Sequence, residues 1–289
     1  MGQITYVSGK YLPHNKACLH VEDRSTQFSD GVYEVIAVIS GNLVDPQMHY
    51  KRLLRSLTEL KMRLPISIQA LNLNIKEVIR RNRLQSGLCY LQVSRGSAPR
   101  NHAIPTLTKE SVVITAKHSE PSGGKAAKQG VSVITTEDIR WRRPDIKSVS
   151  LLPNVLAKNQ AAQNGAFEAW LVEPGDDRIV IEGSSSNAWI VNDAGQVLTH
   201  PEGIKMLSGV TRNRIINLAN SNGIQILEKP FTIAEAKTAP EAFMTSTSSF
   251  VIPVIKIDGH KIGNGRCGAV TLTIQKLYND FAQNLYSGA

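Results

Sequence analysis

The stretch YEVIAVISGNLVDPQMHYKRLLRSLTEL, residues 33–60, contains the signals of a strand, a turn and a helix in succession. Residues 33–38 are rich in β-branched and apolar side chains and predict a strand, and residues 40–42 predict the turn that follows. Asp45-Pro46 is typical of a helix start, because a capping side chain precedes proline at the first helical position. Leucines then recur at helical spacing. Similar alternation elsewhere predicts an α/β protein with α+β mixed sheets.

A glycine-rich segment separates two halves that each mix strands and helices. Residues 119–130 (SEPSGGKAAKQG) are small and polar, which is typical of a linker. The chain has 289 residues, enough for two domains. We therefore predict an N-terminal α/β domain over residues 1–118, an interdomain linker over 119–130, and a C-terminal α/β domain over 131–289.

The composition is that of an ordinary globular protein and excludes wholesale disorder, with 42% hydrophobic and 20% charged residues. The net charge of +9 leaves a nucleic-acid-binding protein as an alternative, but the basic residues are dispersed and aromatics are only 6%. We find no signal pattern and no apolar run near the ~20 residues of a membrane helix. Cys18, Cys89 and Cys267 form no metal pattern, which predicts reduced thiols, no metal and a cytoplasmic protein.

A glycine motif near the end of the chain raises the possibility of a nicotinamide oxidoreductase. Residues 263–268 (GNGRCG) match G-x-G-x-x-G between a strand-like run and a helix. A dinucleotide-binding unit also needs a second strand with an acidic residue about 20 residues further on. Because the chain ends at Ala289, we interpret the motif as a glycine loop between a hairpin and a helix.

Several segments carry chemistry that is ambiguous when each is taken alone. Glu182 ends an apolar strand, residues 209–211 open a helix whose N–H groups suit a phosphate, and residues 245–249 form a hydroxyl cluster. Arg100 lies in a loop after a strand and could bind a carboxylate through two hydrogen bonds. Ordinary turns, helix starts and solvated loops explain the same features, and Lys147 alone indicates nothing.

Taken together and in order, six segments resemble the pyridoxal-phosphate enzymes of fold type IV. The segments are residues 23–34 (DRSTQFSDGVYE), 49–53 (HYKRL), 145–152 (DIKSVSLL), 182–187 (EGSSSN), 209–212 (GVTR) and 245–248 (TSTS). The loop Pro99-Arg100-Asn101-His102 makes the chain most similar to the D-amino-acid (D-alanine) aminotransferases. The resemblance implies a two-domain fold with pyridoxal 5'-phosphate between the domains.

This resemblance implies a role for each cofactor-binding residue. Lys147 would form the Schiff base with the cofactor and would then carry a proton to and from the substrate Cα. Glu182 would keep the pyridine nitrogen protonated, so that the ring withdraws electrons. The remaining contacts would come from Arg52, Val210, Thr211, Ser246 and Thr247 at the phosphate and from Leu207 at the ring face.

The resemblance also implies the substrate contacts and the reaction. Tyr33, Arg100 and His102 would hold the α-carboxylate, and the loop bearing Arg100 and His102 would reach the neighbouring active site in a homodimer. The expected reaction moves the amino group of a D-amino acid, with D-alanine favoured, to a 2-oxo acid such as 2-oxoglutarate or pyruvate. The two substrates would react in turn, by a ping-pong mechanism.

Three departures from the family pattern bear on substrate range. Ser29 and Pro153 replace residues that are more often glycine or, at position 153, asparagine, and Phe250 begins a segment that is usually acidic and would reshape the pocket. The nearest alternative is a branched-chain L-amino-acid aminotransferase, followed by an aminodeoxychorismate lyase and an (R)-amine transaminase. The pair Arg100 and His102 argues against the first, because this loop suits a carboxylate better than an aliphatic side chain.

Overall fold

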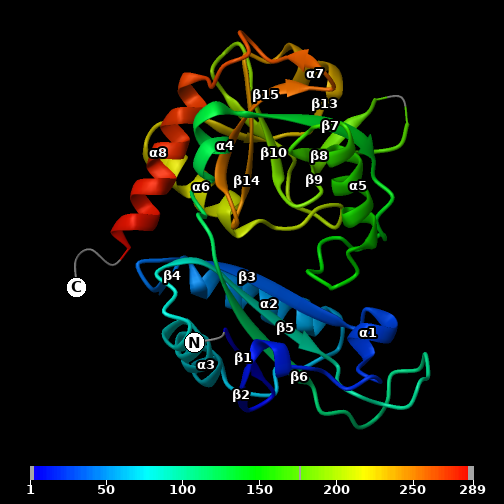
Figure 1. Ribbon diagram of the computed structural model, residues 1–289. Coiled ribbons are helices and arrows are strands. Elements are labelled where there is room, and N and C mark those ends of the chain that lie inside the picture. The colour runs from blue at the N-terminus through cyan, green and yellow to red at the C-terminus, as the bar shows by residue number, and fades with distance from the viewer. Residues whose placement is uncertain (1–2, 176, 286–289) are drawn as a thin grey trace. The chain divides into compact units, whose positions relative to one another are not determined.

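The computed structural model describes residues 3–175 and 177–285, which form two compact units. The units contain Met1–Pro121 with Ile146–Ser150, and Ser122–Asp145 with Leu151–Ala289. Each unit has its own sheet, and Figure 1 shows the strands and helices of both. The short segment 146–150 therefore belongs to the first unit, although it follows the start of the second in sequence.

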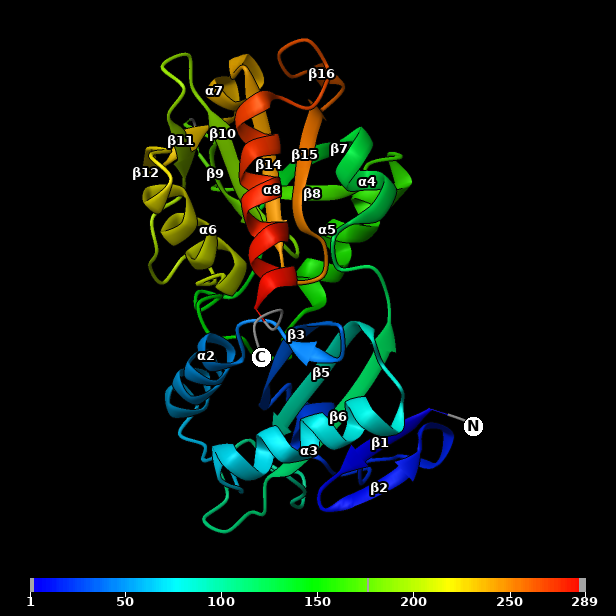
Figure 2. The same ribbon diagram turned by 90° about the vertical axis from the view of Figure 1, so that its left-hand side faces the viewer.

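The first unit is built on a six-stranded antiparallel sheet of order β2-β1-β6-β5-β3-β4. Side chains along β5 and β6 alternate between buried and partly exposed, because one face of the sheet carries the core. Figure 2 shows α3 lying over β1 and β6, and α2 contacts β3. The strands are β1 (Ile4–Val7), β2 (Lys10–Pro13), β3 (Gly31–Ile39), β4 (Asn42–Leu43), β5 (Ser86–Ser94) and β6 (Ser111–His118).

The helices of the first unit follow the predicted apolar spacing. Leu53 and Leu57 are fully buried in the core, which confirms the helix predicted after residue 45. The predicted capping by Asp45 is wrong, because this residue adopts a left-handed conformation with φ 50° and its side chain caps no helical N–H. The helices are η1 (His14–Lys16), α1 (Arg24–Phe28), α2 (Pro46–Glu59) and α3 (Ile68–Arg81).

The second unit is built on a ten-stranded mixed sheet of order β12-β11-β10-β14-β15-β7-β8-β9-β13, with β16 paired to β15. The strands β8, β10 and β11 are buried along their whole length, because helices or loops cover both of their faces. The strands are β7 (Val131–Glu137), β8 (Glu168–Val172), β9 (Ile179–Gly183), β10 (Asn187–Val191), β11 (Val197–Thr199), β12 (Ile226–Glu228), β13 (Phe231–Thr232), β14 (Glu241–Ser246), β15 (Phe250–Ile257) and β16 (His260–Lys261).

Helices lie on both faces of this second sheet. Figure 1 shows α6 and α8 side by side on one face, where both contact β14, and α5 on the other, where it contacts β7 and β8. The helices are α4 (Gly124–Gln129), α5 (Leu152–Gln163), α6 (Val210–Ser221), α7 (Ile233–Thr238) and α8 (Ala269–Asn284).

The predicted class of α/β with mixed sheets is confirmed by these two units. The segment expected to be the linker, 119–130, contains the helix α4, whose Ala127 is buried and belongs to the core of the second unit. Among residues 3–175 and 177–285, no helix is long and apolar enough to cross a bilayer.

Candidate active site

Lys147 lies in the first unit, where backbone hydrogen bonds fix its position beside β3. Its carbonyl accepts a hydrogen bond from the Tyr33 amide (3.0 Å), and its amide donates to Ser56 Oγ (3.2 Å). The Nζ atom lies 4.2 Å from the centroid of the Tyr33 ring, a geometry that stabilises a cation over an aromatic face. Two of the predicted site residues, Tyr33 and Lys147, are therefore in contact.

A buried ionic network joins β3 to α2. Glu34 is fully buried and accepts hydrogen bonds from Arg52 Nε (2.8 Å) and Nη2 (2.7 Å), with His49 Nδ1 2.7 Å from Glu34 Oε2. Burial alone would raise the pKa of Glu34, but Arg52 and His49 outweigh it and lower the pKa to about 2. Burial also lowers the pKa of His49. The network thus fixes the guanidinium of Arg52, the predicted phosphate ligand of this unit.

This network predicts acid sensitivity. Because the pKa of Glu34 is lower in the folded state than its ordinary value of 4.5, its stabilisation is complete above pH 4.5 and disappears as the pH falls toward 2. We expect the free energy of unfolding to fall by about 3 kcal/mol over this range. Urea unfolding of the wild type and of Glu34→Gln at several pH values measures this loss. The free energy of unfolding of the variant should depend much less on pH.

A surface carboxylate provides the matched control for this measurement. Glu77 also has a pKa lowered to about 2, by Arg80 and Arg81, but these ion pairs are exposed to solvent. Solvent-exposed pairs contribute little to stability. Glu77→Gln should therefore retain the acid dependence of the wild type. An equal loss of acid dependence in both variants would contradict the assignment to Glu34.

Glu182 lies in the second unit at the end of β9, where its carboxylate accepts hydrogen bonds from a guanidinium, a backbone amide and a side-chain amide. Oε1 accepts from Arg140 Nη1 (2.5 Å) and the Leu207 amide (3.0 Å), and Oε2 accepts from Asn187 Nδ2 (3.1 Å). Burial raises the pKa of Glu182, and the charge of Arg140 acts in the opposite direction. The donors favour the ionised form of the carboxylate, and Oε2 retains a lone pair that can accept from a further N–H donor.

The start of α6 lies next to this carboxylate through Asn187. A Cβ atom on Gly209 would collide with the side-chain oxygen of Asn187, so glycine is required for this close approach. No side chain caps the helix, which leaves its first N–H groups available to a ligand. Thr211 Oγ1 is buried and has no hydrogen-bond partner among the described residues. Val210 precedes it in the first turn, so both predicted residues lie at the same helix end.

The hydroxyl cluster 245–249 reaches the same region through the sheet. Thr245 pairs with Asn187 across β14 and β10. Ser246 ends β14, and its Oγ lies 3.2 Å from Ser248 Oγ and 2.8 Å from Ser249 Oγ. Thr247 follows in the turn and is partly buried. Thus Asn187 connects the carboxylate, the helix start and the hydroxyl turn within one unit.

The loop predicted to bind the substrate carboxylate packs on α1 of the first unit. The Arg100 guanidinium carbon lies 4.9 Å from the centroid of the Phe28 ring, and the His102 ring lies 5.1 Å from it. Both side chains are exposed. The structure therefore brings Arg100 and His102 together on one aromatic ring, while Tyr33 contacts Lys147 and stacks on Tyr90.

The three departures have local explanations. Ser29 ends α1 with φ 56°, a left-handed conformation in which glycine is common, and Pro153 lies in the first turn of α5, where proline is tolerated. Phe250 also has a positive φ of 53°, but its ring is buried against Tyr278 of α8, 4.8 Å between centroids. The expectation that Phe250 reshapes the pocket stays a prediction, and its ring is buried among the core residues.

Comparison with known proteins gives the family. Residues 31–257 match the model of amino-transferase class IV. The chain belongs to this family. It is 37% identical to a D-alanine aminotransferase from Staphylococcus haemolyticus over 96% of this chain and 98% of that protein. The corresponding enzyme from Bacillus licheniformis is 39% identical over 93% of both chains.

Solved structures of branched-chain amino acid aminotransferases share the fold. The T.th. enzyme with pyridoxamine 5'-phosphate has a TM-score of 0.89 and 26% identity, and the match covers 98% of this chain and 95% of that chain. The Escherichia coli enzyme has a TM-score of 0.87 at 24% identity, with the same coverage. The class IV aminotransferase described here is thus a pyridoxal-phosphate-dependent transaminase.

The residues present fit this cofactor. The uncapped start of α6 and the unpartnered Thr211 hydroxyl are donors that a phosphate group would satisfy. Glu182 Oε2 can accept the N–H of a protonated pyridine. In the first unit, the Lys147 amine has no carboxylate partner among the described residues and is available to an aldehyde. No cluster of metal-binding side chains occurs in the same part of the chain.

Sequence reasoning assigned no role to three further residues of this aminotransferase. Glu34 is the partner of Arg52, and Arg140 is the partner of Glu182. Glu168 is buried at the start of β8 and accepts hydrogen bonds from Ser184 Oγ and from Ser185 Oγ (2.6 Å), so it holds the turn that follows Glu182. The available signal was the acidic residue at positions 34 and 168, each within an apolar strand, because a carboxylate in such a strand needs a buried partner.

Proposed function

We propose that this enzyme transfers the amino group of D-alanine, or of another D-amino acid, to a 2-oxo acid such as 2-oxoglutarate. The observation that carries the proposal is the 37–39% identity to D-alanine aminotransferases over more than nine-tenths of the chain. The branched-chain enzymes of similar fold are only 24–26% identical. The second candidate is therefore a branched-chain L-amino-acid aminotransferase, which the fold alone favours.

The cofactor residues have distinct tasks in this proposal. Pyridoxal phosphate, when bound, supplies an aldehyde that accepts the amino group and a ring that withdraws electrons. Lys147 holds the cofactor and moves a proton at the substrate Cα. Glu182 keeps a negative charge at the ring nitrogen, while Arg140 keeps Glu182 ionised. The other cofactor contacts come from Leu207 at the ring and from Arg52, Val210, Thr211, Ser246 and Thr247 at the phosphate.

The substrate α-carboxylate is bound by Tyr33, Arg100 and His102 in this proposal. A guanidinium forms two parallel hydrogen bonds with a carboxylate, and the exposed loop leaves Arg100 free to do so. We propose that the enzyme is a homodimer in which this loop completes the neighbouring active site. Light scattering should then give twice the chain mass of 31.6 kDa. The three free cysteines suit the proposed cytoplasmic location.

Replacement of Arg100 by glutamine is expected to raise the KM for D-alanine by about 10- to 100-fold, because a charged hydrogen-bonding pair is lost. Cofactor affinity and visible absorbance should remain as in the wild type. Steady-state kinetics and cofactor titration measure both. The control is Arg80→Gln, which removes an exposed charge on α3. An unchanged KM for Arg100→Gln would exclude carboxylate binding by this residue.

The choice between substrates is tested with purified holoenzyme and separate amino donors. D-alanine and L-leucine are each supplied with 2-oxoglutarate, and the released 2-oxo acid is measured. We expect turnover with D-alanine and little with L-leucine. Preference for L-leucine would identify the branched-chain activity, pyruvate release from aminodeoxychorismate would identify the lyase, and turnover of an (R)-amine without a carboxylate would identify an amine transaminase.

A further inference from the structure

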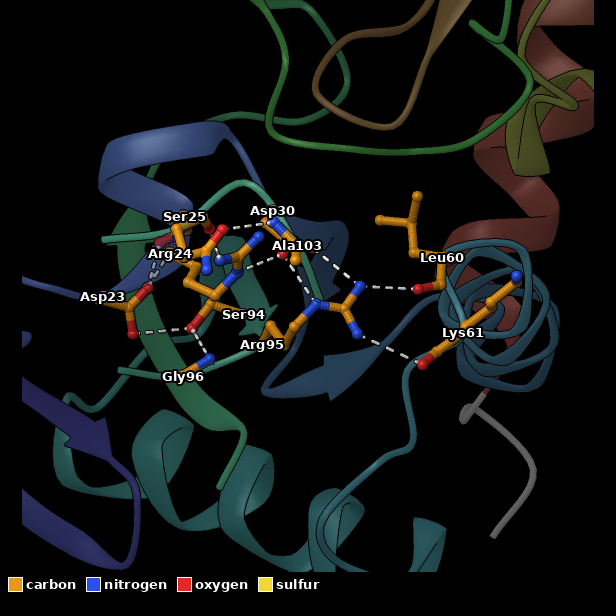
Figure 3. Close-up of polar contacts among 11 residues, drawn as sticks. Asp23, Arg24, Ser25, Asp30, Leu60, Lys61, Ser94, Arg95, Gly96 and Ala103 are labelled. Atoms are coloured by element: carbon orange, nitrogen blue, oxygen red, sulfur yellow. Dashed lines mark hydrogen bonds and ion pairs between the residues drawn. The ribbon is translucent and has the colours of Figure 1, made fainter. Parts of the chain in front are cut away.

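Two buried arginines of the first unit share one carboxylate. Asp30 Oδ2 accepts from Arg24 Nε (2.7 Å) and from Arg95 Nε (2.7 Å), and Oδ1 accepts from Arg95 Nη2 (3.0 Å). Both arginines are about 95% buried. Figure 3 shows the two guanidinium groups meeting at Asp30. Such a cluster fixes both side chains, because a buried charge cannot leave its partner without a large desolvation cost.

The two arginines extend from Asp30 to different parts of the chain. Arg95 donates to the carbonyls of Leu60 (2.7 Å) and Lys61 (3.3 Å), just after the end of α2, as Figure 3 shows. Arg24 Nη1 instead donates to the carbonyl of Asn101 (2.6 Å). Asn101 lies between the two residues proposed to bind the substrate carboxylate. Among the residues that the structure describes, Arg24 therefore contacts Asn101, whereas the side chain of Arg95 donates to Asp30, Leu60 and Lys61.

Phe28 adds a second contact between α1 and the same loop. The Arg24 guanidinium carbon lies 4.6 Å from the centroid of the Phe28 ring, and Arg100 packs against this ring as well. The helix itself is held firmly, since Asp23 accepts from Ser25 N (2.9 Å) and from Ser94 Oγ (2.8 Å). Residues 98–110 contain no helix or strand, so contacts of this kind determine where the loop lies.

We propose that Arg24 is a positioning residue for substrate recognition: through the Asn101 carbonyl and the Phe28 ring, it holds Arg100 and His102 in the arrangement that binds the α-carboxylate. The inference rests on the proposed function of that loop. Arg24 does not touch the substrate. It acts by removing freedom from an exposed loop whose binding groups must be accurately placed.

A double-mutant cycle on the holoenzyme tests this inference. Arg24→Gln should raise the KM for D-alanine roughly tenfold with little change in kcat, because a misplaced binding group weakens substrate capture. Arg24→Gln combined with Arg100→Gln should raise the KM by clearly less than the product of the two single effects, since part of the effect of Arg24 passes through Arg100. Arg95→Gln is the matched control, because it removes the other partner of Asp30 without a contact to Asn101. Any fold-change in KM caused by Arg95→Gln should multiply with the fold-change caused by Arg100→Gln.

Trypsin cleavage after Arg100 gives a readout that does not depend on activity. Arg24→Gln should increase the cleavage rate at this bond several-fold, whereas Arg95→Gln should lower the melting temperature without a selective increase there. If Arg24→Gln does not fold, Phe28→Leu serves instead, since it leaves the ion pairs of Asp30 intact. Phe28→Leu should likewise raise the KM and accelerate cleavage after Arg100.

The outcomes separate this inference from the proposed function. An unchanged KM for Arg100→Gln would overturn the carboxylate-binding role of the loop, and with it the reason for positioning. A raised KM for Arg100→Gln, together with a multiplicative effect of Arg24→Gln and unaltered trypsin cleavage, would overturn only the positioning role of Arg24.

Discussion

Replacement of Lys147 by alanine is expected to remove the visible absorbance of the bound cofactor and to reduce turnover by at least about 10⁴-fold. In the proposed function the amine would both bond to the cofactor and move the proton at the substrate Cα, so one substitution would remove two steps. The backbone contacts of residue 147 with Tyr33 and Ser56 do not involve the side chain and should persist. Absorption spectra and single-turnover kinetics with D-alanine measure the two effects.

Lys147→Arg is the matched control for charge. It keeps a cation over the Tyr33 ring but cannot form the bond to an aldehyde, so its activity should also be lost. Its thermal stability should be close to that of the wild type. Turnover near the wild-type level in either variant would show that another group carries the chemistry.

Glu182→Gln is expected to lower kcat by about 10²- to 10³-fold, because the site loses the charge that matches the protonated ring nitrogen. Glutamine has nearly the same shape, and the amide of Leu207 can still donate to its oxygen. The cofactor should still bind through Lys147 and retain its visible absorbance. The expected result is therefore a catalytic defect without loss of the cofactor, measured by kinetics and cofactor titration.

A surface carboxylate again supplies the control for Glu182. Glu173 forms an ion pair with the exposed Lys205 (2.5 Å), so Glu173→Gln removes one negative charge of the same unit without entering the site. Its kcat should equal that of the wild type. Equal kcat values for Glu182→Gln and the wild type would exclude Glu182 from contact with the ring nitrogen.

The elements with strong local patterns could be predicted from the sequence. The run of β-branched and apolar residues in β3 and the leucine spacing of α2 are local properties, and the structure confirms both elements. The hairpin β1–β2 was not predicted, because its strands have four residues each and carry little periodicity. The helix α4 was not predicted, because the glycines at its start are more typical of a linker.

The site could be predicted only as an ordered set of motifs, because its partners are distant in sequence. Glu34 and Arg52 are separated by 18 positions, and Arg140 and Glu182 by 42. These pairings depend on how helices and strands pack, which local spacing does not reveal. Likewise, nothing in the sequence indicates that Lys147 joins the first unit while Glu182 belongs to the second.

The most direct test of the central claim is to identify the lysine that carries the cofactor. The holoenzyme is reduced with borohydride, which fixes the cofactor covalently to its lysine, and the digested protein is analysed by mass spectrometry. The account predicts one phosphopyridoxyl group, on the peptide that contains Lys147. A label on a different lysine, or a reduced holoenzyme without any label, would contradict it.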